Sequence, residues 1–466
     1  MSTVLPSSDG HDDPGEPLVG LEPIYDYFRS GEKTRDRFAI GTEHEKFGFL
    51  RRGHEPLPYE GPSGIESILH QIADDDSDDQ GAWRRVDEAG RTIALARGRA
   101  TISLEPGGQL ELSGAPLKTL HETCREVGEH LELLKLASLP RGVGFIGMGF
   151  HPTASWASIP SVPKGRYAIM ERYMPTRGHR GLDMMKRTCT VQANFDYESE
   201  ADMALTMRTA MLIAPLVTPL FANSPLREGA PSGVLSERTL VWADTDPDRS
   251  GFLDVTLKPG FGYEQWIEYV LDVPMYFIRR DGIHHDFAGA SFREFLRSGL
   301  GGFRATLRDF EDHLTTVFTE VRLKKFLEVR SADCGPWSRI CALPALYKGV
   351  LYDERARTEA AALLDGATAA ELFRLQQDAA VQGFDARFRG HTIHALCQSL
   401  VDISRAGLLR IAERDQIPDE TAYLRPLITV VEERRTFAEK LLDKLRFEWD
   451  GNLDRLWSEL EFFAED

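Results

Sequence analysis

The pattern of apolar and polar residues predicts four short strands that each carry a polar face. These strands are predicted at 41–49, 101–113, 190–196 and 326–330. Successive side chains of a strand point to opposite faces, so we expect Glu43 and Glu45 on the same face. The polar faces of the other strands carry Gln109 and Glu111, Gln192 and Asn194, and Glu328 and Arg330. One such strand is ordinary, but four together indicate a shared site on one sheet.

Apolar residues recur with the 3.6-residue period of a helix at 117–139 and in several segments from about residue 344 onward. Further helices are predicted at 21–30, 167–173, 199–213, 369–377, 393–412 and 422–445, and a β-hairpin at 91–104. Residues 1–20 are polar and rich in Pro and Gly, which predicts a disordered leader. We therefore predict an α+β fold with one catalytic domain at residues 21–466, helix-rich from about residue 344.

Charge and cysteine content narrow the class of protein. The chain has 55 basic and 73 acidic residues and a net charge of −18, which argues against a nucleic acid or an anionic membrane surface as partner. The longest apolar run, 210–222, contains Pro215 and Pro219 and is expected in the core. The acidic run 74–79 is expected to be a solvated loop. Five scattered cysteines and an N-terminus without a signal-peptide pattern predict a cytoplasmic protein.

Carboxylates that converge on one sheet face repel one another unless a cation lies among them. Magnesium prefers such oxygen ligands, and histidines and cysteines are absent from three of the four strands, which disfavours zinc. His44 is expected to point away from the Glu43 and Glu45 face. The candidate oxygen ligands are the carboxylates of Glu43, Glu45, Glu105, Glu111 and Glu328 and the amide carbonyls of Gln109, Gln192 and Asn194.

Basic residues near these strands are candidates for binding anions. Lys164 and Arg166 lie beside a glycine in a Pro-rich loop, and Arg187 precedes the strand at 190–196. Arg330 is the strongest phosphate-binding candidate, because it shares a strand face with Glu328.

A second basic group lies in the segment SERTLVWADTDPDR, where Arg238 and Arg249 flank Trp242. This spacing places a two-point carboxylate-binding group near an aromatic wall. A role as ordinary surface residues is an equally open interpretation.

Taken together, the segments IGTEHEKFGF, ISLEPGGQLELSGAPL, VPKGRYAIM and GLDMMKRTCTVQANFDY resemble the glutamate–cysteine ligase family of the plant and proteobacterial type. The resemblance runs from about residue 21 to 353 and continues more loosely to the C-terminus. It implies a glutamine-synthetase-like curved antiparallel sheet that holds two or three Mg²⁺ ions, with Mn²⁺ as a possible substitute. It also implies that ATP phosphorylates the γ-carboxylate of L-glutamate and that the amine of L-cysteine displaces phosphate. The product would be γ-glutamylcysteine, the first intermediate of glutathione biosynthesis.

The resemblance also implies roles for individual residues. Arg330 would bind phosphate and act with Glu328 in catalysis, and Arg238 would hold the α-carboxylate of glutamate. Lys164 and Arg166 are further candidates for ATP binding. Metal-site residues would be Glu43, Glu45, Glu105, Gln109, Glu111 and Glu328. Substrate-binding residues would be Arg238, Gln192, Asn194, Arg187, Trp242 and Arg249.

Two alternatives remain at this stage. The first is a γ-glutamyl ligase with another amine as acceptor, and the second is an inactive homologue that binds nucleotide or glutamate. The sequence leaves open whether the protein is a monomer or a homodimer. Phe287 occupies the position of a regulatory cysteine in the plant enzymes, so a redox switch is not expected.

Overall fold

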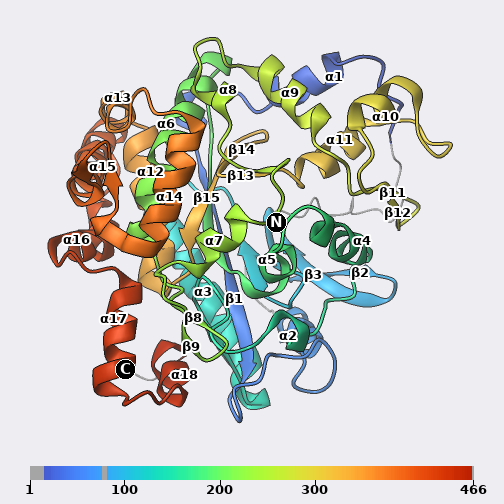
Figure 1. Cartoon of the computed structure of the whole chain (residues 1–466). Coiled ribbons are helices and arrows are strands. Elements are labelled where there is room, and N and C mark those ends of the chain that lie inside the picture. The colour runs from blue at the N-terminus through green and yellow to red at the C-terminus, as the bar shows by residue number, and fades with distance from the viewer. Residues whose placement is uncertain (1–14, 76–80, 464–466) are drawn as a thin grey trace.

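A large antiparallel sheet forms the centre of the computed structural model, which describes residues 15–75 and 81–463 (Figure 1). Within the described residues it has nine strands in the order β14-β15-β7-β1-β5-β4-β3-β2, and β6 pairs with β1. Its strands are β1 (Ile40–Leu50), β2 (Arg84–Glu88), β3 (Arg91–Arg97), β4 (Ala100–Leu104), β5 (Leu110–Ser113), β6 (Val143–Ile146), β7 (Thr190–Phe195), β14 (Val321–Leu323) and β15 (Leu327–Asp333). Short two-stranded pairs are formed by β8 (Leu226–Arg227) with β9 (Ala230–Pro231), β10 (Ser250–Gly251) with β13 (Phe318–Thr319), β11 (Phe277–Arg280) with β12 (Ile283–Asp286), and β16 (Arg387–Phe388) with β17 (His391–Thr392).

Helices surround the sheet, and those of the C-terminal part gather on one side of it (Figure 1). The helices of the N-terminal half are α1 (Glu22–Arg29), α2 (Ile65–Asp75), α3 (Leu120–Ser138), α4 (Gly165–Tyr173), α5 (Gly181–Arg187), α6 (Glu200–Phe221) and α7 (Glu237–Ala243). The remaining helices are α8 (Asp254–Leu257), α9 (Tyr263–Asp272), α10 (Phe292–Ser298), α11 (Leu307–Leu314), α12 (Trp337–Leu351), α13 (Glu354–Ala362), α14 (Ala369–Gln382), α15 (Ile393–Asp415), α16 (Arg425–Glu432), α17 (Phe437–Asp443) and α18 (Asp454–Leu460). The predicted α+β class and the helix-rich C-terminal part are confirmed.

The strand registers place the predicted polar residues on one face. Glu43 of β1 lies opposite Ser113 of β5 and Gln192 of β7. Glu45 lies opposite Glu111, and Glu328 of β15 lies opposite Asn194. Because paired residues of an antiparallel sheet project to the same side, these strands present one continuous polar face.

The other face of the sheet is apolar and supports the site from behind. Val191, Ala193 and Phe195 of β7 belong to the core that contains α6 and α12. His44 also lies on this face, where its ring is 5.5 Å from that of His130. Its expected orientation away from the carboxylates is confirmed.

Helix α6 is a core helix. It is long and apolar enough to cross a membrane by length and composition alone, but 83% of its most apolar window is buried inside the protein. The helix continues through Pro215 and Pro219, beyond the predicted end near residue 213. The expectation that 210–222 is a core segment is confirmed.

Three expectations about local structure are wrong. Helix α2 was not predicted, and it includes Asp74 and Asp75 of the expected acidic loop, whereas 76–79 lie outside the described residues. The predicted helix at 422–445 is two helices, α16 and α17, separated by a turn in which Arg434 has φ 51°.

The predicted leader also ends earlier than residue 20. Leu18 N–H donates to Ala305 C=O at 2.8 Å, and Pro17 forms a β-bridge with Thr306. Residues 1–14 of the predicted leader lie outside the described part of the chain. A backbone pairing between residues this far apart in sequence leaves no composition signal, which explains the wrong boundary.

Candidate functional site

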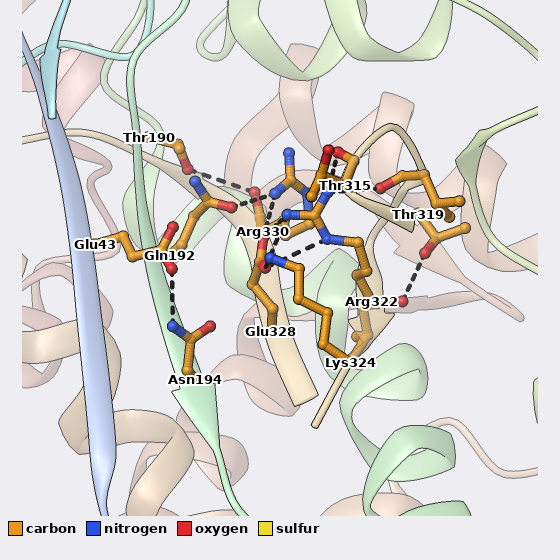
Figure 2. Close-up of polar contacts among 12 residues, drawn as sticks. Glu43, Thr190, Gln192, Asn194, Thr315, Thr319, Arg322, Lys324, Glu328 and Arg330 are labelled. Atoms are coloured by element: carbon orange, nitrogen blue, oxygen red, sulfur yellow. Dashed lines mark hydrogen bonds and ion pairs between the residues drawn. The ribbon is translucent and has the colours of Figure 1, made fainter. Parts of the chain in front are cut away.

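Glu328 on β15 is surrounded by three cations (Figure 2). Arg322 Nη2 lies 2.6 Å from Glu328 Oε1, Lys324 Nζ lies 2.9 Å from Oε2, and Arg330 Nη1 also contacts Oε1. Burial alone would raise the pKa of the Glu328 carboxyl, but Arg322, Lys324 and Arg330 together hold it well below its usual value. Glu328 is therefore ionised, and its negative charge is balanced by these three cations. Both of its oxygens are engaged by them, so in this arrangement it is not available as a metal ligand.

Sequence reasoning missed Arg322 and Lys324. Both lie on the β14–β15 hairpin, and Arg322 is directly opposite Glu328 in the strand register. The alternation in VRLKKFLEVR is the signal that would have found them, since it places Arg322 and Lys324 on one face of a strand.

The carboxylates of β1 and β5 form the acidic part of the same face. Asn194 Nδ2 donates to Glu43 Oε1 at 2.8 Å, and Thr190 N–H donates to Glu45 Oε2 at 2.9 Å. Burial raises the pKa of Glu43, and the charges of Glu328 and Glu111 add to the rise. Burial raises the pKa of Glu45 to about 8. Buried carboxylates that raise one another's pKa are stabilised by a cation.

These carboxylates fit a magnesium site that is completed by substrate and water better than a site in which the protein supplies every ligand. Among the described residues, no three His, Cys, Asp or Glu side chains converge closely enough to hold one ion. Magnesium is usually held by one or two carboxylates together with substrate phosphates and water. Glu43, Glu45, Glu105 and Glu111 fit that pattern.

Gln109 has a structural role in this arrangement. Its Oε1 accepts from Gly107 N–H at 2.9 Å, and its Nε2 donates to the carbonyls of Met185 and Thr188. The amide thus ties the turn after β4 to the end of α5, and the expected role as a metal ligand is not supported by these contacts.

Gln192 connects the acidic part of the face to Arg330. Its Oε1 accepts from Arg330 Nη1, while its Nε2 is buried without a hydrogen-bond partner among the described residues. A bulge in β15 between Val329 and Ala332 puts Arg330 at this position. Arg330 thereby faces both Glu328 and Gln192 (Figure 2).

A small pocket adjoins this face, which we call the Arg238 pocket. Arg238 Nη2 donates to Arg330 C=O at 2.8 Å, and the guanidinium carbon atoms of Arg238 and Arg330 lie 5.8 and 5.6 Å from the centre of the Trp242 ring. The lining residues are Arg238, Thr239, Trp242, Phe318, Thr319, Glu320, Arg330, Ser331 and Gln376. A hollow next to it shares Arg238, Trp242 and Arg330 and is also lined by Glu45, Glu105, Gln109, Met184, Thr188 and Thr190.

The start of helix α7 positions Arg238. Ser236 caps the helix by accepting from Thr239 N–H, and its hydroxyl donates to Asp333 Oδ1 at 2.9 Å. Asp333 Oδ2 accepts from Ser224 Oγ at 2.6 Å, and Ser224 Oγ in turn accepts from Arg238 N–H. The last residue of β15 therefore fixes the first turn of α7 against the sheet.

A wider cavity of about 340 Å³ lies over the beginning of β1, which we call the Lys33 cavity. Glu43 and Asn194 line it from the sheet, and Arg99 lines it from the β3–β4 turn. Lys33 Nζ forms an ion pair with Asp196 Oδ1 at 2.5 Å at its edge. Sequence reasoning missed this cavity, because part of its wall, including Lys33 and Arg99, comes from segments outside the predicted polar strands.

Arg249 is not part of the site, contrary to expectation. It is fully buried, and its guanidinium donates to Asp246, Thr316 and Pro274 and lies over the Tyr276 ring. These contacts use the group for packing, so its expected role in substrate binding is wrong in this arrangement.

Arg187 also lies outside the Arg238 pocket. Its Nη1 contacts Asp183 and Glu228, and its guanidinium lies 4.3 Å from the centre of the Phe150 ring. These contacts do not place it against the carboxylates of the sheet.

Lys164 and Arg166 lie near the end of β4. Lys164 Nζ donates to Leu104 C=O at 2.7 Å, and burial together with Arg166 lowers its pKa to about 7, against the opposing charge of Glu105. The pair is therefore beside the acidic face, on the side of Glu105.

Comparison with known proteins gives the family. The family model described as glutamate-cysteine ligase family 2 matches residues 39–459. The chain belongs to this family. It is 44% identical over 448 residues to the chloroplastic glutamate–cysteine ligases of Nicotiana tabacum and Arabidopsis thaliana, over 96% of this chain and 83% of each relative. The resemblance seen in the sequence is confirmed.

A solved structure from the same functional class has the same fold as this ligase-family chain. The glutamate–cysteine ligase of Francisella tularensis in complex with AMP covers 91% of this chain and 88% of its own, with a TM-score of 0.53 and 13% sequence identity. At that identity the similarity concerns the fold alone.

The expected cytoplasmic location is contradicted by the relatives. The enzymes from Nicotiana tabacum, Medicago truncatula and Arabidopsis thaliana are all named as chloroplastic. All five cysteines of this chain are free and buried.

Proposed function

We propose that this ligase-family chain joins the γ-carboxylate of L-glutamate to the amine of L-cysteine, with hydrolysis of ATP. In this reaction ATP phosphorylates the γ-carboxylate, and the amine then displaces phosphate to give γ-glutamylcysteine. The observation that carries the proposal is the placement of the carboxylates of β1 between two spaces. Glu43 lines the Lys33 cavity, and Glu45, two residues further along the same face, lines the hollow beside the Arg238 pocket.

The two spaces suit the two substrates of the first step. The Lys33 cavity has the volume and polar walls for a nucleotide, with Arg99 and Lys33 as cations. The Arg238 pocket is small and has an arginine beside an aromatic wall, which suits the head of an amino acid. A nucleotide in the cavity would direct its phosphates along the sheet face toward glutamate.

Buried donors around the Arg238 pocket support a polar ligand there. Arg238 Nε and Trp242 Nε1, which belong to residues lining the pocket, are buried without a hydrogen-bond partner in the described part of the chain. Buried donors are almost always hydrogen-bonded in folded proteins. A bound carboxylate or phosphate would supply the missing acceptors.

Electrostatics explains how these residues promote the first step. Forming an acyl phosphate brings a carboxylate and a phosphate together, and the two anions repel each other. Arg330 and Arg238 place positive charge at this point, and fixed charges in a site with little water act strongly. Mg²⁺, held by one or two of the carboxylates of Glu43, Glu45, Glu105 and Glu111 together with phosphate oxygens and water, would neutralise further charge on the phosphate.

The proposal treats the chain as one catalytic unit. The two spaces take residues from Lys33, which precedes β1, to Gln376 of α14, so we expect this whole segment to act as one unit.

Phosphate release by the purified protein tests the proposal. The assay contains ATP, Mg²⁺ and L-glutamate, with either L-cysteine or one of a panel of other amines, and mass spectrometry identifies the product. We expect release with cysteine to exceed release with every other amine and to yield γ-glutamylcysteine. Faster release with another amine would assign a different acceptor, and no release with any amine would reject ligase activity.

A further inference from the structure

Glu320 has a position in the Arg238 pocket that the proposed reaction has not yet used. Among the described residues that line this pocket it is the only acid, and it faces two arginines, Arg238 and Arg330. It lies between β13 and β14, where Arg330 N–H donates to its carbonyl at 3.1 Å.

Two donors fix the orientation of the Glu320 carboxylate. Ser331 Oγ donates to Oε2 at 2.6 Å, and Gln376 Nε2 donates to the same oxygen at 2.8 Å. Ser331 and Gln376 are both buried, and they come from β15 and α14. Both bonds end on Oε2, so Oε1 remains outside them as an acceptor for a ligand.

The head of an α-amino acid carries a carboxylate and an ammonium group on one carbon atom. A site that binds both groups needs a cation and an anion close together, each held in a fixed orientation. The Arg238 pocket has this combination: the buried Nε of Arg238 has no hydrogen-bond partner within residues 15–75 and 81–463, and Glu320 is held by two donors.

We infer that Glu320 binds the α-ammonium of the glutamate substrate, while Arg238 binds its α-carboxylate. This inference rests on the proposed function, because it names the part of the substrate that the pocket recognises. Glu320 is then the residue that selects an amino acid over a plain dicarboxylate.

Glutarate tests this role directly, because it equals glutamate without the α-amino group. Discrimination is measured as the ratio of kcat/KM for the two compounds in phosphate release at saturating ATP, with hydroxylamine as acceptor. For the unaltered protein we expect glutamate to be preferred at least 100-fold. In Glu320→Gln the preference should fall by tenfold or more, because the variant loses attraction for the ammonium and repulsion of the second carboxylate of glutarate.

Asp378→Asn is the matched control. Asp378 is an acid on α14 two residues after Gln376 and is not among the residues that line the pocket. It should keep the preference within twofold. If Glu320 only balances the charge of Arg238 and Arg330, Glu320→Gln would lower turnover of glutamate and glutarate equally, and an unchanged ratio would overturn the inference.

Two further measurements distinguish a wrong inference from a variant that does not fold and from a wrong proposed function. Gln376→Leu removes one donor to Glu320 and should lower the preference about threefold to tenfold, so it replaces Glu320→Gln if that variant does not fold. An increase in the KM for cysteine without loss of preference would place the acceptor here and overturn the inference. If the protein releases no phosphate, calorimetric binding of glutamate and glutarate tests Glu320 independently of the proposed reaction, and equal binding would overturn it.

Discussion

Replacement of Arg238 by lysine tests the assignment of the glutamate carboxylate. Arg238 is buried, it donates to Arg330 C=O through Nη2, and its Nε has no partner in the described part of the chain. Lysine keeps the charge but loses the planar fork that binds a carboxylate at two points. The variant can satisfy either the Arg330 carbonyl or the substrate, but not both in the same geometry.

The structure sets the size of the effect. One charge-assisted hydrogen bond contributes roughly 1.5–3 kcal/mol, and about 1.4 kcal/mol corresponds to a factor of ten. We therefore expect Arg238→Lys to raise the KM for glutamate by roughly tenfold to 100-fold. The KM for ATP should change by less than about twofold, because Arg238 does not line the Lys33 cavity.

The assay is the initial rate of phosphate release, with glutamate varied at saturating ATP and then ATP varied at saturating glutamate. Arg374→Lys, at an exposed position on α14, controls for the substitution itself. A glutamate KM within twofold of the unaltered protein would refute the assignment. Equal increases in both KM values with a lower Tm would instead show that Arg238 mainly supports the fold.

Four further predictions follow from the same site and its surroundings. Activity should require Mg²⁺ or Mn²⁺ and should not be restored by Zn²⁺, and full phosphate release in excess chelator would contradict this. Glu328→Gln should abolish turnover and lower the free energy of unfolding by about 3–5 kcal/mol, because it leaves three buried cations without their anion. A near-native rate, measured on a variant that a denaturant titration shows to be folded, would refute this prediction. Burial raises the pKa of the Glu126 carboxyl to about 7, so its contribution to stability is fully present below about pH 4.5 and is lost as the pH rises through 7. In urea titrations over this pH range, the free energy of unfolding of the unaltered protein should fall by at most about 3 kcal/mol relative to that of Glu126→Gln. Thiol reductants should leave activity unchanged, and mass spectrometry should find no disulfide, including at the neighbouring pair Cys124 and Cys341.

The polar face of the sheet was predictable because strand alternation is a local property. Glu43, Glu45, Glu111 and Gln192 each lie within a strand whose neighbours alternate in polarity, and the registers then bring them together. The order of the strands was not predictable from alternation, because the pairing between β1, β7 and β15 joins segments separated by more than a hundred residues. The family resemblance implied a curved antiparallel sheet but no strand order.

Roles that depend on tertiary contacts were the ones that sequence reasoning misjudged. Arg249 and Arg238 both flank Trp242 in the sequence, yet only Arg238 faces the pocket, because helix α7 ends before Arg249 and the chain turns into the core. Gln376 lines the pocket from a segment predicted to be helical, and the residues around it in the sequence carry no pattern that indicates a site. Helix periodicity identifies a buried residue but does not show what it is buried against.

The distribution of charge on the sheet explains why nucleotide and metal are expected together. Around Glu328, the three cations Arg322, Lys324 and Arg330 surround one carboxylate, so this part of the face is cationic. On β1, burial and neighbouring acids raise the pKa values of Glu43 and Glu45, so that part resists full ionisation without added positive charge. A phosphate alone would be attracted to the first part and repelled by the second. A phosphate that arrives with a divalent cation complements both parts at once, because its oxygens face the arginines while the cation faces the carboxylates.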